Sequence, residues 1–304
     1  MARAQWVKWK KGGGPRVRGT LKYDPPQPHG PWTKIMGVVA RCEGCHDTVV
    51  MYDETGVTWG FLQWTFKSGR LQKLLESFKS IPAYDFEEEG VHHTLFDLVC
   101  CESLPQLTQK FERFGFKIEG GKFVDLNRGR VLKMTNKTQR KRCVDICMGR
   151  VQYPGNLKKQ KQHAMALARV FDGIGNEFGV AEAQVQFAKQ EFKRQMKYKR
   201  PPLGGKSIAK LLTTKDGLMY EYPLVALFFN LWQNNPGAAY RLFLKAKKVL
   251  SGDFSDSFFH QAWTLANRSK FGNWGWKKGA KSPRVVRIKK AIKEFYGMDV
   301  PYHK

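Results

Sequence analysis

The chain has 304 residues with 53 Lys and Arg against 26 Asp and Glu, which gives a formal net charge of +27 at pH 7. This length allows one large core or two modest ones, and the ordinary apolar content with nine Trp excludes a disordered protein. So large a basic excess indicates a polyanionic partner, such as nucleic acid, an anionic wall polymer or an acidic membrane surface. No apolar run approaches the roughly 20 residues of a membrane-spanning helix, and no secretory signal is expected.

The N-terminal part of the chain changes character at Pro31. Residues 1–30 have many cations, a Gly-Gly-Gly run and Pro25-Pro26, so they predict a basic extended arm that is either a solubilising tail or a binding arm. Residues 31–41 favour a helix, because Pro31 suits a first turn and the next apolar residues share one side. Residues 48–52 predict a short strand, which a turn at residues 53–56 ends.

The rest of the chain is mostly helical in pattern. A helix is expected after Trp64, with Leu71, Leu74, Leu75 and Phe78 inward, and residues 122–134 predict a β-hairpin around Asn-Arg-Gly. Pro201-Pro202-Leu-Gly-Gly could be an internal joint. Helical spacing recurs over residues 157–172, 181–196, 222–232, 238–249, 256–266 and 285–296. The expected fold class is therefore mainly α, of the α+β type, with a small β element.

Three interpretations compete for Cys42-Glu-Gly-Cys45-His46. The string matches a haem attachment pattern, which would require export and a second axial ligand. Cys42 and Cys45 together with Cys143 and Cys147 form two close pairs, and four thiolates suit a structural zinc ion. In the third interpretation, the cysteines are small buried residues beside a working carboxylate at Glu43.

The carboxylate interpretation has a definite chemistry. Cleavage of a glycosidic bond needs one carboxylic acid that keeps its proton near neutral pH and delivers it to the leaving oxygen. A second acidic or polar group then stabilises the oxocarbenium ion or positions water. Glu43 ends an apolar helix, Asp53 and Glu54 lie on the following turn, and Gly60-Phe-Leu-Gln63 returns the chain.

This stretch resembles the lysozyme-like superfamily of soluble lytic transglycosylases and goose-type lysozymes. Glu43-Gly44 stands where the family has Glu-Ser, and Gly60-Phe61-Leu62-Gln63 stands where it has Gly-Leu-Met-Gln. The resemblance implies that Glu43 is the catalytic acid, and that Glu54 or Asp53 occupies the place of the additional acidic residue in the goose-type enzymes. It also implies that Gln63 lines the substrate cleft.

A second block is similar in texture to the family's Ala-Tyr-Asn-Ala-Gly helix end. It comprises Ala226 to Asn230 and Asn234 to Tyr240, so Asn230 would take the place of the family Asn at the cleft, with Tyr240 beside it. Gly44 replaces the family serine and Phe229 the family tyrosine. The two blocks also lie far apart, which makes residues 80–155 an expected insertion.

The resemblance implies a lysozyme-like catalytic domain over residues 31–250, between the basic arm and a basic helical segment at residues 251–304. Its substrate would be the MurNAc-GlcNAc bond of peptidoglycan, without a cofactor, and Trp59 could stack on a sugar face or belong to the core. The charge and the lack of an expected signal suggest a phage product that acts on the bacterial wall from the virion or from the host cytoplasm, with DNA or other virion proteins as further partners. The alternative is a basic nucleic-acid-binding or virion structural protein without activity on a degenerate scaffold of this kind.

Overall fold

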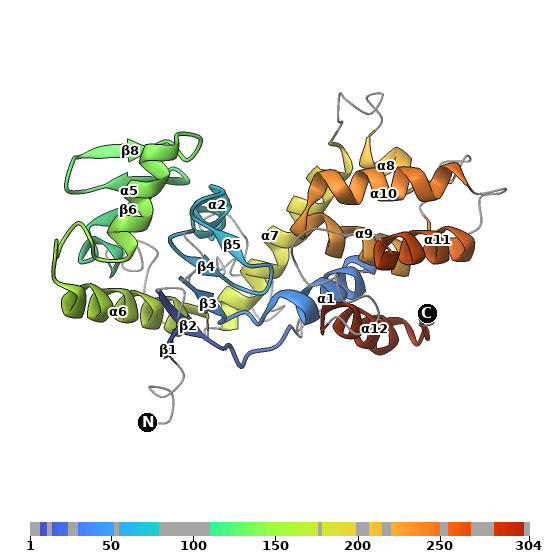
Figure 1. Ribbon diagram of the computed structural model, residues 1–304, viewed down its shortest axis with the longest axis horizontal. Coiled ribbons are helices and arrows are strands. Elements are labelled where there is room, and N and C mark those ends of the chain that lie inside the picture. Colours follow the sequence, from blue (N-terminus) through green and yellow to red (C-terminus); the bar gives the residue numbers. More distant parts are fainter. Residues whose placement is uncertain are drawn as a thin grey trace, which may run out of the picture. The chain divides into compact units, whose positions relative to one another are not determined.

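The computed structural model describes residues 7–10, 14–23, 30–51, 55–78, 110–175, 178–198, 207–214, 220–249, 255–268 and 283–300. Within these ranges the protein is mainly helical, as the sequence predicts, and it has two small antiparallel sheets where one β element was expected (Figure 1). It divides into two compact units, unit 1 with Met1–Tyr23 and Gly44–Phe187, and unit 2 with Asp24–Glu43 and Ala188–Lys304. Within the described ranges, no helix has the length and apolar character to cross a bilayer.

The first sheet of unit 1 is an antiparallel meander. Its strands follow chain order, namely β1 (Val7–Lys10), β2 (Gly14–Val17), β3 (Val49–Val50), β4 (Thr58–Trp59) and β5 (Trp64–Thr65). Val17 of β2 pairs with Val49 of β3, and Val17 is buried. Part of the segment that was expected to be an extended arm is therefore a hairpin of this sheet. The local sequence pattern does not predict this hairpin, because β3, the strand that pairs with β2, comes some thirty residues later in the chain.

The second sheet of unit 1 contains the predicted hairpin. Its strands are β6 (Phe116–Glu119), β7 (Lys122–Asp125) and β8 (Arg130–Leu132), and the pairing of β7 with β8 confirms the hairpin within residues 122–134. Among the described residues of this unit, the helices include α2 (Arg70–Ser77), α5 (Lys137–Cys147), α6 (Leu157–Gly175) and the first part of α7 (Phe178–Met196). α6 packs along β1, β2 and β3, and α5 packs on β7 and β8.

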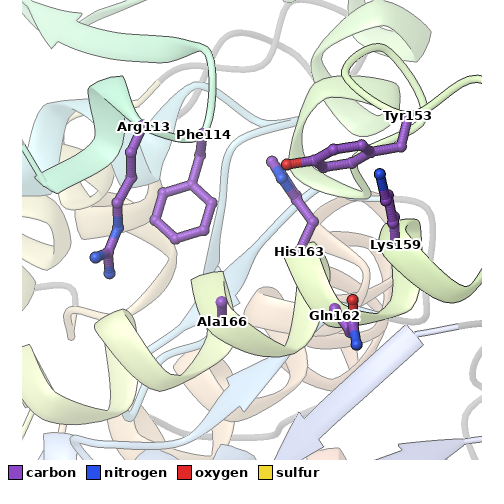
Figure 2. A pocket seen from close by; sticks show the side chains of 7 residues that line it. All are labelled: Arg113, Phe114, Tyr153, Lys159, Gln162, His163 and Ala166. Atoms are coloured by element: carbon purple, nitrogen blue, oxygen red, sulfur yellow. The ribbon is translucent and has the colours of Figure 1, made fainter.

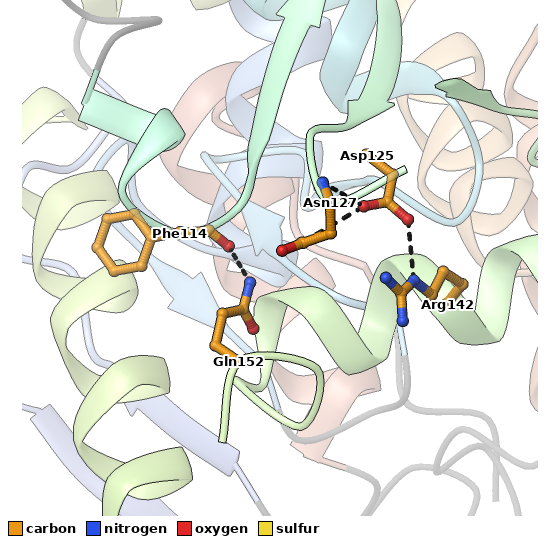
Figure 3. A network of polar contacts seen from close by, with 5 residues as sticks. All are labelled: Phe114, Asp125, Asn127, Arg142 and Gln152. Atoms are coloured by element: carbon orange, nitrogen blue, oxygen red, sulfur yellow. Dashed lines mark hydrogen bonds and ion pairs between the residues drawn. The ribbon is translucent and has the colours of Figure 1, made fainter. Parts of the chain in front are cut away.

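A buried carboxylate fastens the second sheet to α5 (Figure 3). Asp125, at the end of β7, is fully buried, and its Oδ2 accepts a hydrogen bond of 2.9 Å from Nε of Arg142 on α5. Its Oδ1 accepts the backbone N–H of Asn127 at 3.0 Å, which shapes the hairpin turn. A buried charge is tolerated where an opposite charge and hydrogen bonds compensate it, so this residue fixes both the turn and the helix.

An aromatic cluster fills the interior of unit 1. Phe116 and Phe123 stack at a centroid distance of 4.5 Å across the second sheet, and Phe66 meets both rings edge-on. Phe171 of α6 stacks on Phe111 at 5.1 Å. Each fully buried Phe contributes on the order of 2–3 kcal/mol of transfer free energy, and such ring pairs add about 1 kcal/mol. This cluster joins α6 and the second sheet in one core.

Unit 2 is helical in its described residues. It contains α1 (Pro31–Glu43), α8 (Ile208–Leu211), α9 (Tyr222–Asn234), α10 (Pro236–Lys248), α11 (Ser255–Arg268), α12 (Pro283–Tyr296) and the end of α7. These helices confirm the helical segments expected in this part of the chain. α1 packs on both α9 and α12. A Cβ at Gly37 would overlap the ring of Phe295, so the missing side chain of Gly37 lets α12 approach α1 closely.

Candidate functional site

Glu43 occupies the position that the sequence predicts, at the end of an apolar helix. It is the last residue of α1, and its side chain is half-buried. The chain then turns sharply, because the N–H of Cys45 donates to Oγ1 of Thr48 at 2.9 Å and the N–H of Thr48 donates to the carbonyl of Cys45 at 3.1 Å. This turn starts β3 directly after the helix.

The Gly60–Gln63 segment forms a tight turn beside Thr48, close to the end of the Cys45–Thr48 turn. The N–H of Gly60 donates to the carbonyl of Thr48 at 3.0 Å. Gln63 has a φ of 53°, and both its backbone N–H and its Nε2 donate to the carbonyl of Gly60, at 3.0 and 2.7 Å. Gln63 therefore holds its own turn, and its role in lining a substrate cleft stays a prediction.

Gly44 lies directly against this turn. A Cβ at Gly44 would be 3.1 Å from Nε2 of Gln63 and 3.2 Å from the Cβ and Oγ1 of Thr48. These distances are shorter than usual contacts of a Cβ, so the neighbours would have to move to admit a larger residue. The space beside Gly44 is therefore too small for the family serine unless Gln63 or Thr48 moves.

Behind the turn lies a buried polar centre, which we call the His46–Asp47 centre. Asp47 is 1% exposed, and its carboxylate accepts hydrogen bonds from the N–H of Thr20 at 2.9 Å, from the Thr20 hydroxyl at 3.1 Å and from the N–H of Leu21 at 3.0 Å. The N–H of His46 donates to the carbonyl of Leu21 at 2.9 Å. These bonds attach the N-terminal segment to the residues that follow Glu43.

Gln184 of α7 completes the His46–Asp47 centre. Its Oε1 accepts Nδ1–H of His46 at 3.1 Å and the N–H of Phe61 at 3.3 Å, while its Nε2 donates to the carbonyl of His46 at 3.0 Å. Because Oε1 can only accept, the imidazole carries its proton on Nδ1. Burial lowers the pKa of His46 from 6.5 to about 4, although the bond to Gln184 and the nearby Asp47 and Glu182 favour the charged form.

We expect this low pKa to make the protein acid-sensitive. The unfolded chain binds a proton at His46 near pH 6.5 and the folded chain only near pH 4, so stability is complete above pH 6.5 and declines as the pH falls through this window. The loss by pH 4 is on the order of 3 kcal/mol from this group. Urea unfolding at several pH values should therefore show a shallower pH slope for His46→Gln than for the unchanged protein. Equal slopes would contradict the assignment.

The residues expected to bind sugar are distributed differently. Trp59 is fully buried, with its ring against Phe171 at 5.5 Å, so it packs in the core of unit 1 and offers no face to a ligand. In unit 2, Asn230 and Tyr240 are 0% and 1% exposed, on α9 and α10. Their expected role in lining an open cleft is therefore corrected to one in helix packing. The candidate acids Asp53 and Glu54 lie outside the described residues.

The four-cysteine zinc site is also corrected. Cys143 and Cys147 lie one turn apart on α5, both buried, and their sulfur atoms pack toward Gly56. Over the described ranges, no group of three His, Cys, Asp or Glu side chains is placed to hold a metal ion. None of Cys42, Cys45, Cys143 and Cys147 forms a disulfide. The second pair therefore belongs to the core, as free cysteines often do.

We expect the α5 thiols to be chemically inert in the folded protein. Burial raises the pKa of the Cys143 thiol, and the neutral thiol is a poor nucleophile. Iodoacetamide labelling followed by peptide mass analysis should modify the half-buried Cys45 at least roughly ten-fold faster than Cys143 or Cys147. All three should react at similar rates in denaturant. Rapid native labelling of Cys143 would show that the α5 pair is accessible.

Gln184 is the residue of the candidate site that sequence reasoning missed. It lies on the buried face of α7 with Val180, Ala183, Phe187 and Ala188. The sequence signal that could have identified it is a glutamine on the face of α7 that apolar residues otherwise occupy. A buried amide must find hydrogen-bond partners, and such a position predicts a polar partner on another segment.

Comparison of the chain with models of protein families, with curated proteins and with solved structures found no match. The chemistry that residues 43–63 could perform is therefore inferred from their own side chains. A half-buried carboxyl group at a helix end can donate and accept a proton. The His46–Asp47 centre, by contrast, has its hydrogen bonds directed inward and serves to position the chain around Gly44.

Proposed function

We propose that the protein cleaves the glycosidic bond between N-acetylmuramic acid and N-acetylglucosamine in peptidoglycan, with Glu43 as the acid. The order of elements supports a lysozyme-like domain. An apolar helix ends in Glu43, a small antiparallel sheet follows, and α9 packs on that helix within unit 2. The basic excess of +27 suits a substrate that belongs to an anionic wall.

One observation carries the proposal. The turn that holds Gly60 and Gln63 returns to Gly44, the residue that follows Glu43, with Nε2 of Gln63 3.1 Å from the position of a Cβ at Gly44. Gly44 and Gln63, which belong to the two motifs of the family resemblance, therefore lie close together, although nearly twenty positions separate them in the chain. The antiparallel pairing of β3 with β4 produces this approach, which a site built from both motifs would require.

In the proposed reaction, the Glu43 carboxyl group donates its proton to the glycosidic oxygen, and the bond from C1 of the muramic acid to that oxygen breaks. In a lytic transglycosylase, the sugar's own 6-hydroxyl then attacks C1 and returns its proton to the Glu43 carboxylate. In a hydrolase, water attacks instead, positioned by Glu54 or Asp53. The first route needs no second carboxylate.

The test is digestion of purified peptidoglycan by the full chain, with mass analysis of the soluble fragments. Cleavage by the transglycosylase route leaves a 1,6-anhydro end, and hydrolysis leaves a reducing end that is heavier by one water. Either product supports the proposal and selects a route. Intact glycan strands after prolonged incubation with folded protein would refute it.

One observation favours a second candidate, a binding protein without glycosidase activity. Phe229 stands in place of the family tyrosine and stacks on Phe192 at 4.4 Å, and the adjacent Asn230 is also buried. The second block of the resemblance thus contributes helix packing in unit 2. If the digestion leaves peptidoglycan unchanged while the protein still sediments with it, the binding function replaces the enzymatic one.

A further inference from the structure

Unit 1 has a basic, aromatic groove (Figure 2) whose lining includes none of the residues of the candidate site. It has a volume of about 460 Å³ and is bounded by Arg113 and Phe114 on one side and by Tyr153 and Lys159 on the other. Gln162, His163 and Ala166 of α6 form its floor. We call it the Arg113–Lys159 groove. Its volume lies in the range of pockets that hold small organic ligands.

The walls of the groove are fixed by hydrogen bonds. Nε2 of Gln152 donates to the carbonyl of Phe114 at 2.6 Å, which joins the turn before β6 to the loop between α5 and α6 (Figure 3). Nε2 of Gln160 donates to the carbonyl of Tyr153 at 2.8 Å and holds that loop on α6. A ligand would therefore meet a site whose backbone is already in place, which reduces the entropic cost of binding.

The floor of the groove is uncharged. His163 is buried, its Nε2–H donates to the carbonyl of Ile146 at 3.1 Å, and burial lowers its pKa. The ring of Phe114 meets that imidazole edge-on at 5.1 Å. The positive charge of the groove therefore comes from Arg113 and Lys159 at its two sides.

Each of these cations lies over an aromatic ring at the edge of the groove. The guanidinium of Arg113 is 4.9 Å from the ring centre of Phe114, and Nζ of Lys159 is 5.9 Å from that of Tyr153. Neither cation forms an ion pair with another described residue. Tyr153 is 37% exposed, so its ring can accept a flat partner.

We propose that the Arg113–Lys159 groove binds single-stranded nucleic acid, with phosphates at Arg113 and Lys159 and a base stacked on Tyr153. Cations beside exposed aromatic rings are the combination that such chains require. The surrounding sequence agrees, because residues 110–175 contain sixteen Lys and Arg and five Asp and Glu. An uncharged glycan would use the ring but not the two cations.

The test measures binding of a fluorescein-labelled 20-mer of thymidylate to the full chain by anisotropy, at a series of salt concentrations. The double variant Arg113→Gln/Lys159→Gln should weaken binding about ten-fold or more, and should lower the slope of log affinity against log salt by about 1.4, the value for two lost phosphate contacts. Tyr153→Leu should weaken binding by about five-fold or more while the slope stays unchanged.

The matched control is Arg241→Gln/Lys245→Gln, which removes the same two charges from exposed positions on α10 of unit 2. It should change the affinity by less than about two-fold, since only a contact with phosphate releases counterions on binding. Equal losses in the two double variants would show that the net charge alone drives binding, and would overturn the proposal. An unchanged affinity of Tyr153→Leu would overturn the stacking role.

Competition distinguishes nucleic acid from the other polymers that the groove could meet. Poly(glycerol phosphate) at the same phosphate concentration should displace the labelled oligonucleotide poorly, and chitotetraose should not displace it. Equal displacement by either polymer would assign the groove to the wall and overturn the proposal. Glu43→Gln should leave oligonucleotide binding unchanged, so this result is independent of the glycosidase test.

Discussion

Replacement of Glu43 by glutamine is expected to reduce the rate at which the protein clears a suspension of purified peptidoglycan by about 10²–10⁴-fold. Glutamine has nearly the shape of glutamic acid but no proton to deliver to the glycosidic oxygen. The helix should be unaffected, because α1 is held by its apolar face against α9 and α12, and Glu43 is only its last residue. The measurement is the initial rate of turbidity loss at equal concentrations of folded protein.

Glu119→Gln supplies the matched control. Glu119 is an exposed residue at the end of β6 in a surface ion pair with Lys117 at 3.2 Å, so the same chemical change there should leave clearing within about two-fold. Retained activity in Glu43→Gln would remove Glu43 from the reaction. A further double variant, Asp53→Asn/Glu54→Gln, separates the two routes, because only the hydrolase requires a carboxylate there.

The second large effect concerns stability. Asp47→Asn is expected to lower the free energy of unfolding by about 2–4 kcal/mol. The buried carboxylate of Asp47 accepts three hydrogen bonds from Thr20 and Leu21. An asparagine amide presents an NH₂ group at one of these positions, so two donors would face each other without water. Urea unfolding at pH 7 provides the measurement.

Asp145→Asn is the comparison for this substitution. Asp145 forms a surface ion pair with Arg150 at 3.0 Å, and its loss should change the free energy of unfolding by less than about 1 kcal/mol. Similar values for the two variants would show that the Asp47 hydrogen bonds do not constrain the fold. At a temperature where Asp47→Asn remains folded, its clearing rate should match that of the unchanged protein, which distinguishes support of the fold from participation in the reaction.

The sequence predicted elements whose signals are local. The helix that ends at Glu43 has Pro31 at its start and an apolar face, and the hairpin of β7 and β8 has a glycine-containing turn between two short apolar runs. Both patterns lie within a dozen or so residues. The N-terminal hairpin was missed because its short strands contain Lys8, Lys10 and Arg16, and because β2 is completed only by pairing with β3.

The candidate site was predictable only in part, for a related reason. The approach of Gln63 to Gly44 follows from two motifs in one stretch, whereas Gln184 comes from a distant helix. Aromatic and amide residues also look alike in a sequence whether they line a cleft or fill a core. Trp59, Asn230 and Tyr240 are buried because the helices and strands around them close over them, and no spacing pattern reports this.

The interleaving of the two units has a consequence for synthesis of the protein. Unit 1 takes its first strands from residues before Asp24 and the remainder from Gly44–Phe187. The segment between them, which contains α1, belongs to unit 2. α1 therefore leaves the ribosome well before α9 and α12, which pack on it, have been made. Nascent chains should therefore expose the apolar residues Ile35, Met36, Val38 and Val39 of α1 until α9 and α12 have been synthesised, and should depend on chaperones for that interval.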